Sequence, residues 1–194
     1  MCIRDRYIAI RLAAVYEQGE STEKAKGVLL SALERKRHDQ RLNFAHAELL
    51  RKEQKSSAED LAYYYKRAFV PNDSNYQSQF WYARYAFELP NPEKQREADR
   101  IFTYLRNARI PFRIKNEVRD TYSRNNKPIE IHGKIVSKKP GFCFIEDETT
   151  GKQYFCPAEN VLEDLYAATR VHDRVKFKLG FCYAGPKCFD VEQA

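Results

Sequence analysis

Three phenylalanines in the stretch 139–157 have the residue type and the spacing that base stacking requires. Phe142 and Phe144 are two residues apart, so in a strand their rings lie on the same face. Thr150-Gly151 predicts a hairpin turn, and the returning strand brings Phe155 onto that face. A small sheet needs only one apolar face for its core. Aromatic rings on the other face therefore predict a surface on which single-stranded bases can stack.

The positive charge of the chain lies before this stretch and not within it. The 194 residues carry 34 Lys and Arg against 27 Asp and Glu, a net charge of +7. Residues 129–194 hold nine basic and ten acidic residues, whereas residues 103–128 hold seven basic and two acidic ones. Phosphate contacts are therefore expected from Arg113, Lys115 and Arg119 in that basic segment. On composition alone, an ordinary solvated helix face explains the same charges.

Residues 110–128 predict a basic helix and a linker. Ile114, Val118 and Tyr122 are spaced as one face of a helix that ends near Asn125-Asn126. We expect this helix to cap the helical part before it, with its basic residues on the opposite face.

Residues 1–109 predict an array of helices. Three sets of apolar residues at positions i, i+4 and i+7 recur at intervals of 36 and 37 residues: Ala25, Leu29 and Ala32; Leu61, Tyr65 and Ala68; and Ala98, Phe102 and Leu105. Each set lies on a predicted helix that follows another one, at 7–18, 42–51 and 76–88. The array resembles tetratricopeptide-type helix-turn-helix repeats, although its period is longer than that family's 34 residues and its Trp, Gly and Tyr signature is poorly kept. Such repeats imply a concave surface for a peptide or partner domain, and other helical repeat types share this packing logic.

Five aromatic residues of this array are interpreted as packing and groove residues: Trp81, Tyr63, Tyr64, Tyr65 and Tyr82. An aromatic stripe at helical spacing is more often core than a binding site. Because Tyr63, Tyr64 and Tyr82 cannot all be buried together, we expect some of them to line the concave surface.

From residue 129 onward the pattern changes from helix to strand spacing. The predicted strands lie at 129–135, 142–145, 154–156, 174–179 and 188–191. A turn is predicted at Ala184-Gly185-Pro186-Lys187, and residues 161–169 are expected to form a connection with helical character. Five short strands in about 66 residues predict a small closed barrel, which avoids exposed edges. The predicted fold class is therefore multidomain α plus β, a helical-repeat array followed by a small five-stranded barrel.

Residues 129–194, a third of the chain, resemble the cold-shock domain. The matching motifs are Gly133-Lys134-Ile135, then Pro140-Gly141-Phe142-Cys143-Phe144-Ile145, then Tyr154-Phe155-Cys156-Pro157, with the last two strands in the same order and spacing. The resemblance implies an OB-fold barrel that binds single-stranded RNA or DNA, with RNA favoured, by stacking on Phe142, Phe144 and Phe155. The cations that it implies near the nucleic-acid backbone are Lys134, Lys138 and Lys139.

Several positions depart from the cold-shock pattern. Val136-Ser137-Lys138 stands where the family has a surface Trp, Pro157 replaces the His of the second motif, and Cys143 replaces the middle Gly of the first. Acidic residues 146–148 follow the first motif. Two missing contact groups, each worth ~1–3 kcal/mol, predict an affinity well below that of a full family member. Protein–protein contact through the same face is a competing interpretation.

The sequence contains no recognisable catalytic or metal-binding pattern. The five cysteines include no C-x-x-C pair, and reduced thiols that pack as small hydrophobes explain them better than zinc. Cys143 and Cys156 are expected to face the core from adjacent strands. A Gly-rich phosphate loop, H-E-x-x-H and G-x-S-x-G are absent, so we expect no enzyme activity, no cofactor and no metal. No apolar run approaches the ~20 residues of a membrane span, and a cytoplasmic protein is expected.

Two functions compete on this evidence. The first is a nucleic-acid-binding module that stacks bases on the barrel aromatics and is attached to a helical scaffold. The second is a protein-interaction scaffold in which the barrel is a structural cap, similar to the tails of large bacterial NTPases, some of them tied to phage defence. Residues 1–6 look like a translated leader, and the array starts without a capping helix. We therefore expect a C-terminal fragment of a larger bacterial protein.

Overall fold

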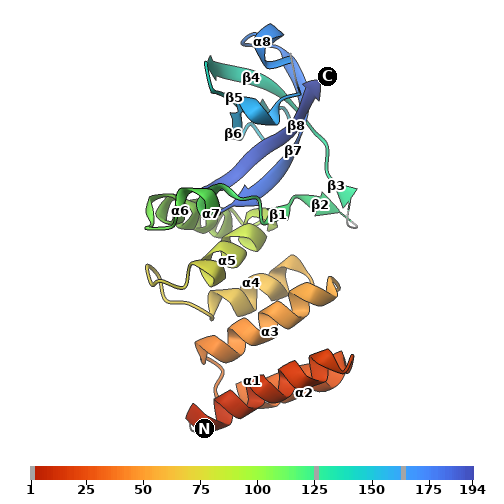
Figure 1. Cartoon of the computed structure of the whole chain (residues 1–194), viewed down its shortest axis with the longest axis vertical. Helices are drawn as coiled ribbons and strands as arrows, with labels where there is room; N and C mark the ends of the chain where they lie inside the picture. The colour runs from red at the N-terminus through yellow and green to blue at the C-terminus, as the bar shows by residue number, and fades with distance from the viewer. Residues whose placement is uncertain (1–2, 125–126, 163–164) are drawn as a thin grey trace. The chain divides into compact units, whose positions relative to one another are not determined.

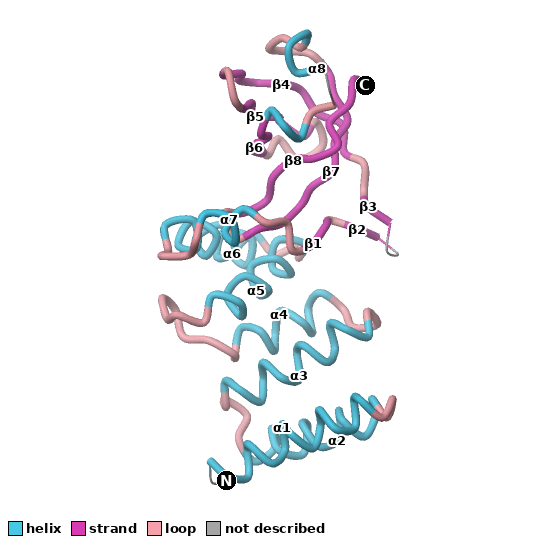
Figure 2. The backbone as a smooth tube through the Cα atoms, viewed as in Figure 1, coloured by secondary structure: helices cyan, strands magenta, loops and turns pink. Residues whose placement is uncertain are grey.

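The computed structural model describes residues 3–124, 127–162 and 165–194, which form two compact units, Met1–Leu105 and Arg106–Ala194 (Figure 1). The first unit is helical and the second is built mainly of strands (Figure 2). The chain is thus a multidomain α plus β protein, as its residue periodicity predicts.

Helices follow one another through the first unit, each packed against its neighbours. Their bounds are α1 Ile3–Gln18, α2 Thr22–Arg35, α3 Gln40–Glu53, α4 Ala58–Lys66, α5 Tyr76–Glu88 and α6 Pro92–Asn107. Local caps fix several of these starts. The Asp39 carboxylate accepts hydrogen bonds from the backbone N–H groups of Arg41 and Leu42, at 3.1 and 3.2 Å. Asn91 accepts one from the N–H of Glu93 at 2.9 Å, just after Pro92 at the first helical position.

The recurring apolar sets are part of the core of this unit. All nine of their members are buried: Ala25, Leu29 and Ala32 on α2; Leu61, Tyr65 and Ala68 on or just after α4; and Ala98, Phe102 and Leu105 on α6. The small residues Ala13, Ala47 and Ala83 on α1, α3 and α5 are buried too, which lets neighbouring helices approach closely. The recurring positions therefore mark buried residues on or next to α2, α4 and α6.

The second unit is a closed barrel. Its helices and strands are α7 Phe112–Asn116, β1 Asp120–Thr121, β2 Ser123–Arg124, β3 Lys127–Pro128, β4 Ile131–Lys139, β5 Phe142–Asp147, β6 Gln153–Pro157, the 3₁₀ helix Ala158–Asn160, α8 Leu165–Ala168, β7 Arg174–Cys182 and β8 Gly185–Gln193. Within the described residues, β7, β4, β5, β6 and β8 pair in that order, and β8 pairs back with β7. This ring of five strands confirms the predicted barrel.

Strand alternation fills the barrel interior. Val175, Phe177 and Leu179 of β7 point inward and are buried, as their spacing predicts. Gly133 of β4 also faces inward, where a Cβ atom would lie 2.6 Å from the carbonyl oxygen of Glu146. The close approach of β4 to β5 therefore requires a glycine at this position.

The helix expected through Tyr122 is wrong beyond Asn116. The chain is already extended at Glu117, and Ile114 and Val118 are both exposed instead of forming a buried stripe. The end of β7 offers free backbone groups, because β4 pairs only with its first half. Segment 119–122 takes those groups: Arg119 N–H donates to Phe181 at 2.8 Å and Tyr122 N–H donates to Leu179 at 2.8 Å. Asn125-Asn126, the predicted end of the helix, lies outside the described residues.

The turn predicted at Ala184-Gly185-Pro186-Lys187 occurs two residues earlier. It lies at Tyr183-Ala184, and Gly185 already begins β8 with a φ of +112°. A tight two-residue hairpin explains this, because Cys182 pairs directly with Gly185. The connection predicted at 161–169 contains α8, and its residues 163 and 164 are not among those described.

Candidate nucleic-acid interface

Three phenylalanine rings gather on the outer face of β5 and β6. Phe144 and Phe155 are directly paired across the two strands, and their ring centroids lie 5.9 Å apart. Phe142 lies 5.9 Å from Phe144 and 5.5 Å from Phe155. Phe155 is 40% exposed and the other two rings are half-buried. We call Phe142, Phe144 and Phe155 the aromatic cluster.

The same two strands fill the core with their other face. Cys143, Ile145, Tyr154 and Cys156 alternate with the cluster and are buried. The hairpin between them is held by Asp147, whose carboxylate accepts hydrogen bonds from Thr149 N–H at 2.8 Å and from the Thr150 hydroxyl at 2.6 Å. The aromatic cluster therefore lies on the face that does not pack into the core, as the alternation predicts.

The residues that replace cold-shock positions border the cluster. Ser137 of β4 pairs with Phe144, and Pro157 of β6 pairs with Phe142. Neither side chain offers a further aromatic ring or a ring N–H donor. This face therefore offers a ligand fewer rings and ring N–H donors than the cold-shock motif contains.

The three lysines predicted near the cluster lie in different settings. Lys138 Nζ donates to the carbonyl oxygens of Thr169, at 2.6 Å, and of Tyr166, and lies 4.6 Å from the centroid of the Tyr166 ring. This ammonium therefore holds the end of α8. Lys139 is exposed and pairs with Phe142, so its ammonium can reach a ligand on the cluster. Lys134 is half-buried and pairs with Glu146 on β5, where an acid stands opposite it.

The basic residues of the predicted helix are also divided. Lys115 Nζ donates to the carbonyl oxygens of Arg106 and Ala108 at 2.8 and 2.9 Å, so it satisfies groups at the end of α6. The Arg119 guanidinium lies 4.3 Å from the centroid of the Tyr183 ring. Arg113 is exposed on α7. Within this trio, Arg113 is the cation least committed to the fold.

Sequence reasoning missed Lys187. Parallel pairing of β6 and β8 places it opposite Phe155, beside the aromatic cluster. Its Nζ donates to the carbonyl oxygen of Asn116 at 2.7 Å. No local signal could reveal this position, because the pairing joins strands about 30 residues apart in the sequence.

The acidic residues after the first motif have structural partners. Asp147 is buried in the hairpin turn, and Glu148 pairs with Arg174 at 3.1 Å. Glu146 accepts a hydrogen bond from the side-chain amide of Gln153 at 3.1 Å. Across the described ranges, no group of three or more His, Cys, Asp or Glu side chains could hold a metal ion.

Four cysteines of the barrel are buried free thiols: Cys143, Cys156, Cys182 and Cys188. Cys143 and Cys156 pair across β5 and β6, as predicted. A hydrogen bond to Cys156 and burial raise the pKa of the Cys143 thiol. For Cys156, the hydrogen bond with Cys143 lowers the pKa, but a hydrogen bond with Cys188 and burial outweigh it and raise the pKa. Thiols held in this protonated form are poor nucleophiles and poor metal ligands.

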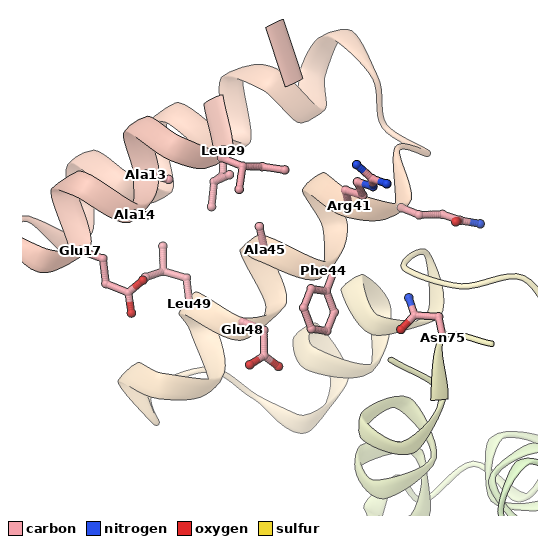
Figure 3. Close-up of a pocket in the computed structure, with 12 residues that line it drawn as sticks. Ala13, Ala14, Glu17, Leu29, Arg41, Phe44, Ala45, Glu48, Leu49 and Asn75 are labelled. Atoms are coloured by element: carbon pink, nitrogen blue, oxygen red, sulfur yellow. The ribbon is translucent and has the colours of Figure 1, made fainter. Parts of the chain in front are cut away.

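The helical unit contains a separate pocket of about 490 Å³ between α1 and α3, reaching the start of α5 (Figure 3). Its apolar lining includes Ile10, Ala13, Phe44 and Leu49, and its polar lining includes Glu17, Arg41, Glu48 and Asn75. The mixture of apolar walls and a few polar groups is typical of ligand pockets.

Glu48, on the pocket wall, belongs to a partly buried network. Its carboxylate accepts hydrogen bonds from Arg51 at 2.9 Å and from the Tyr65 hydroxyl at 2.6 Å. Burial and the Glu48 carboxylate together raise the pKa of Tyr65. The Arg51 guanidinium lies 4.3 Å from the Trp81 ring centroid, and Tyr65 and Tyr85 stack beside that ring. These aromatics are structural supports of the pocket.

The expectation that Tyr63, Tyr64 and Tyr82 are not all buried is confirmed, and Tyr82 is one of the packing residues. Tyr82 is buried and donates its hydroxyl to Glu97, which gives this polar group a partner inside the fold. Tyr63, in contrast, is 44% exposed, and Tyr64 is half-buried. Both lie on α4 and are absent from the lining of the pocket between α1 and α3.

None of the described helices has the length and apolar composition of a membrane-spanning segment. Comparison of the chain with known protein families and with curated proteins finds no family model and no curated protein that matches it.

Proposed function

We propose that the barrel binds single-stranded nucleic acid, RNA in preference to DNA, by stacking bases on the aromatic cluster. The proposal takes the barrel as a cold-shock-like OB domain and the helices as a tetratricopeptide-like scaffold. It places the protein in the cytoplasm, where thiols such as Cys143 and Cys156 stay reduced.

One observation carries this proposal: three aromatic rings stand together on the face of β5 and β6 that the core does not use. Unpaired bases stack on such rings without regard to sequence, at ~1–3 kcal/mol per base. The exposed Lys139 beside Phe142 supplies a cation for the backbone. Because Ser137 and Pro157 replace a ring and a donor, the affinity should be moderate.

The test is a titration of the full chain with a fluorescent oligouridylate, followed by anisotropy. The variant Phe142→Leu/Phe144→Leu removes two π-faces while keeping apolar bulk, and we expect about 100-fold weaker binding. A double-stranded RNA of the same length is the control ligand, since its bases are already stacked. Matched ribo- and deoxyribo-oligomers measure the preference for RNA. Unchanged binding by the double variant contradicts the proposal.

A second candidate function is a protein-interaction scaffold. The pocket between α1 and α3 supports it, because its size and mixed lining suit a short peptide segment. Phe44→Ser, on the pocket wall, should then abolish recovery of a partner protein in a pulldown treated with nuclease. Recovery that survives this substitution would exclude the pocket as the partner site.

A further inference from the structure

A strongly basic hollow lies in the helical unit, in a part of the chain that the proposed function does not use. It has a volume of about 650 Å³ and is lined by the end of α2, the loop after it, the start of α3 and one residue of α1. The cationic and titratable residues along it are Arg6, Arg35, Lys36, Arg37, His38, Asp39 and Arg41. We call this site the basic hollow.

The carboxylate that lines the hollow is already engaged. Asp39 accepts hydrogen bonds from two backbone N–H groups at the start of α3 and pairs with Arg6 at 3.2 Å. Its side chain is almost fully buried by these contacts. Asp39 therefore cannot neutralise the other cations along the hollow.

Those other cations lack carboxylate partners in the part of the chain that the structure describes. Arg35, Lys36, Arg37 and Arg41 are exposed, and within the described ranges none of them forms an ion pair.

The contrast with neighbouring cations on the same helices is clear. Lys26 of α2 pairs with Glu53 at 2.6 Å, Arg51 of α3 pairs with Glu48 at 2.9 Å, and Lys52 pairs with Glu17. Positive charge left unpaired at one place creates a field that attracts polyanions.

An aromatic hollow adjoins the basic one and shares Arg37 with it. Its volume is about 220 Å³, and its lining comprises Leu30, Leu33, Glu34, Arg37, Asn43, Tyr63 and Tyr64. The Tyr63 and Tyr64 rings meet edge to face with centroids 5.0 Å apart. The Arg67 guanidinium lies 3.5 Å from the Tyr63 centroid, on one side of that ring.

We propose that the helical unit carries a second binding site for single-stranded nucleic acid. The basic hollow holds phosphates and Tyr63 stacks an adjacent base. Aromatic rings beside unpaired cations favour a nucleic acid over an acidic peptide, because a peptide of Asp and Glu offers charge but no π-face. The site shares no residue with the aromatic cluster, and we expect an oligouridylate long enough to engage both sites, so that a loss at either one lowers the affinity of the full chain.

Phosphate binding in the basic hollow is tested in the full chain with fluorescent oligouridylate at several salt concentrations. The variant Arg35→Gln/Lys36→Gln/Arg37→Gln should bind at least about tenfold more weakly at low salt, and its salt slope should fall by about 2. The control Lys55→Gln/Arg96→Gln/Arg100→Gln removes three charges from exposed residues of the same unit. It should change affinity by less than about threefold.

Base stacking on Tyr63 is tested with Tyr63→Leu. This substitution should weaken binding of the oligouridylate about fivefold and leave binding of an abasic oligomer of equal length unchanged. Equal losses with both oligomers would show that Tyr63 does not contact bases and would overturn its proposed stacking role.

The same variants separate this site from the barrel. The triple charge variant is also measured in the Phe142→Leu/Phe144→Leu background, where it should reduce the remaining affinity further. If it has no effect in either background, or no more effect than the control triple, the basic hollow is not a nucleic-acid site, whatever the phenylalanine variant shows. If polyglutamate binds as tightly as the oligouridylate, and if the same triple variant loses that binding, the hollow is instead a site for an acidic protein. A wild-type chain that binds no oligouridylate overturns both sites.

Discussion

Phe144 and Phe155 lie opposite one another on β5 and β6, with ring centroids 5.9 Å apart and ring planes at 66°. Their strand neighbours Ile145 and Tyr154 also pair, but on the inner face, where both are buried. One hairpin thus supplies both core packing and an exposed aromatic surface. The surface can be altered without touching the core, and the variants below use that separation.

Phe155→Leu should weaken binding of single-stranded RNA about tenfold. Phe155 is the most exposed ring of the cluster, so its loss removes a stacking face while leaving the buried side of β6 intact. Anisotropy titrations measure the affinity. Phe112→Leu is the matched control, because Phe112 is 83% exposed on α7, outside the cluster. Equal losses for the two substitutions would show that exposed aromatic area in general, and not the cluster, drives binding.

Two adjacent lysines should behave differently. Lys138→Met removes hydrogen bonds to Tyr166 and Thr169 and should destabilise the barrel by about 1–2 kcal/mol. Lys139→Met should leave stability unchanged and reduce the salt slope of RNA binding by about 0.7, the value for one phosphate contact.

Thiol labelling measures the loss of barrel stability that is predicted for Lys138→Met. Cys143 is buried and its pKa is raised, so iodoacetamide reaches it only when the barrel opens. Lys138→Met should speed labelling of Cys143 about 5- to 30-fold. If Lys139→Met speeds it equally, the distinction between the two lysines is wrong.

Gly133→Ala should destabilise the barrel by about 1–3 kcal/mol, because the added methyl would meet the carbonyl oxygen of Glu146 at 2.6 Å and the Phe177 ring at 2.8 Å. Gly141→Ala is the control: no atom lies within 4 Å of the position that its added methyl would take, and the barrel should keep its stability within about 1 kcal/mol. Labelling rates of Cys156 compare the two variants. Similar labelling rates in the two variants would mean that β4 and β5 can move apart at Gly133 without a loss of stability.

The helical unit should lose stability in acid through His46. Burial and the charge of Lys26 lower the pKa of His46 to about 4, against an opposing effect of Glu53. Its Nδ1 is buried without a partner among the described residues, and Tyr64 packs edge-on against the ring. Above pH 6.5 both the folded and unfolded chains hold a neutral imidazole. Between pH 6.5 and 4 only the unfolded chain binds the proton, so about 2–3 kcal/mol is lost as the pH falls.

Fluorescence of Trp81 reports this effect, because it is the only tryptophan of the chain and is buried in the helical unit. Urea unfolding at pH 7 and pH 4 should show a smaller acid loss for His46→Gln than for the wild type. His38→Gln, which replaces an exposed histidine of the same unit, should match the wild type. An identical acid loss in the His46 and His38 variants would exclude His46 as the cause.

Local patterns in the sequence predict the hairpin and the buried positions of the helices well. Alternation fixes which face Phe142 and Cys143 occupy, and the i, i+4, i+7 sets mark the buried stripes, because both signals arise within one element.

Pairing between distant strands explains what the sequence could not reveal. The stretch after Asn116 has a helical spacing, but the free end of β7 offers it backbone partners, and tertiary pairing overrides local propensity. Lys138 looks like a surface cation until α8 folds over it, and Lys187 comes to lie opposite Phe155 only when β6 and β8 close the barrel. Residues whose positions at the site depend on closure of the barrel therefore cannot be identified from local sequence patterns.

Photo-cross-linking reports directly whether bases stack on the aromatic cluster. A 4-thiouridine oligomer is bound to the full chain and irradiated, and the linked peptides are identified by mass spectrometry. Cross-links are expected in peptides that contain Phe142, Phe144 or Phe155, and they should be lost when a double-stranded oligomer replaces the single strand. Cross-links confined to the helical unit, with none on β5 or β6, would contradict base stacking on the aromatic cluster.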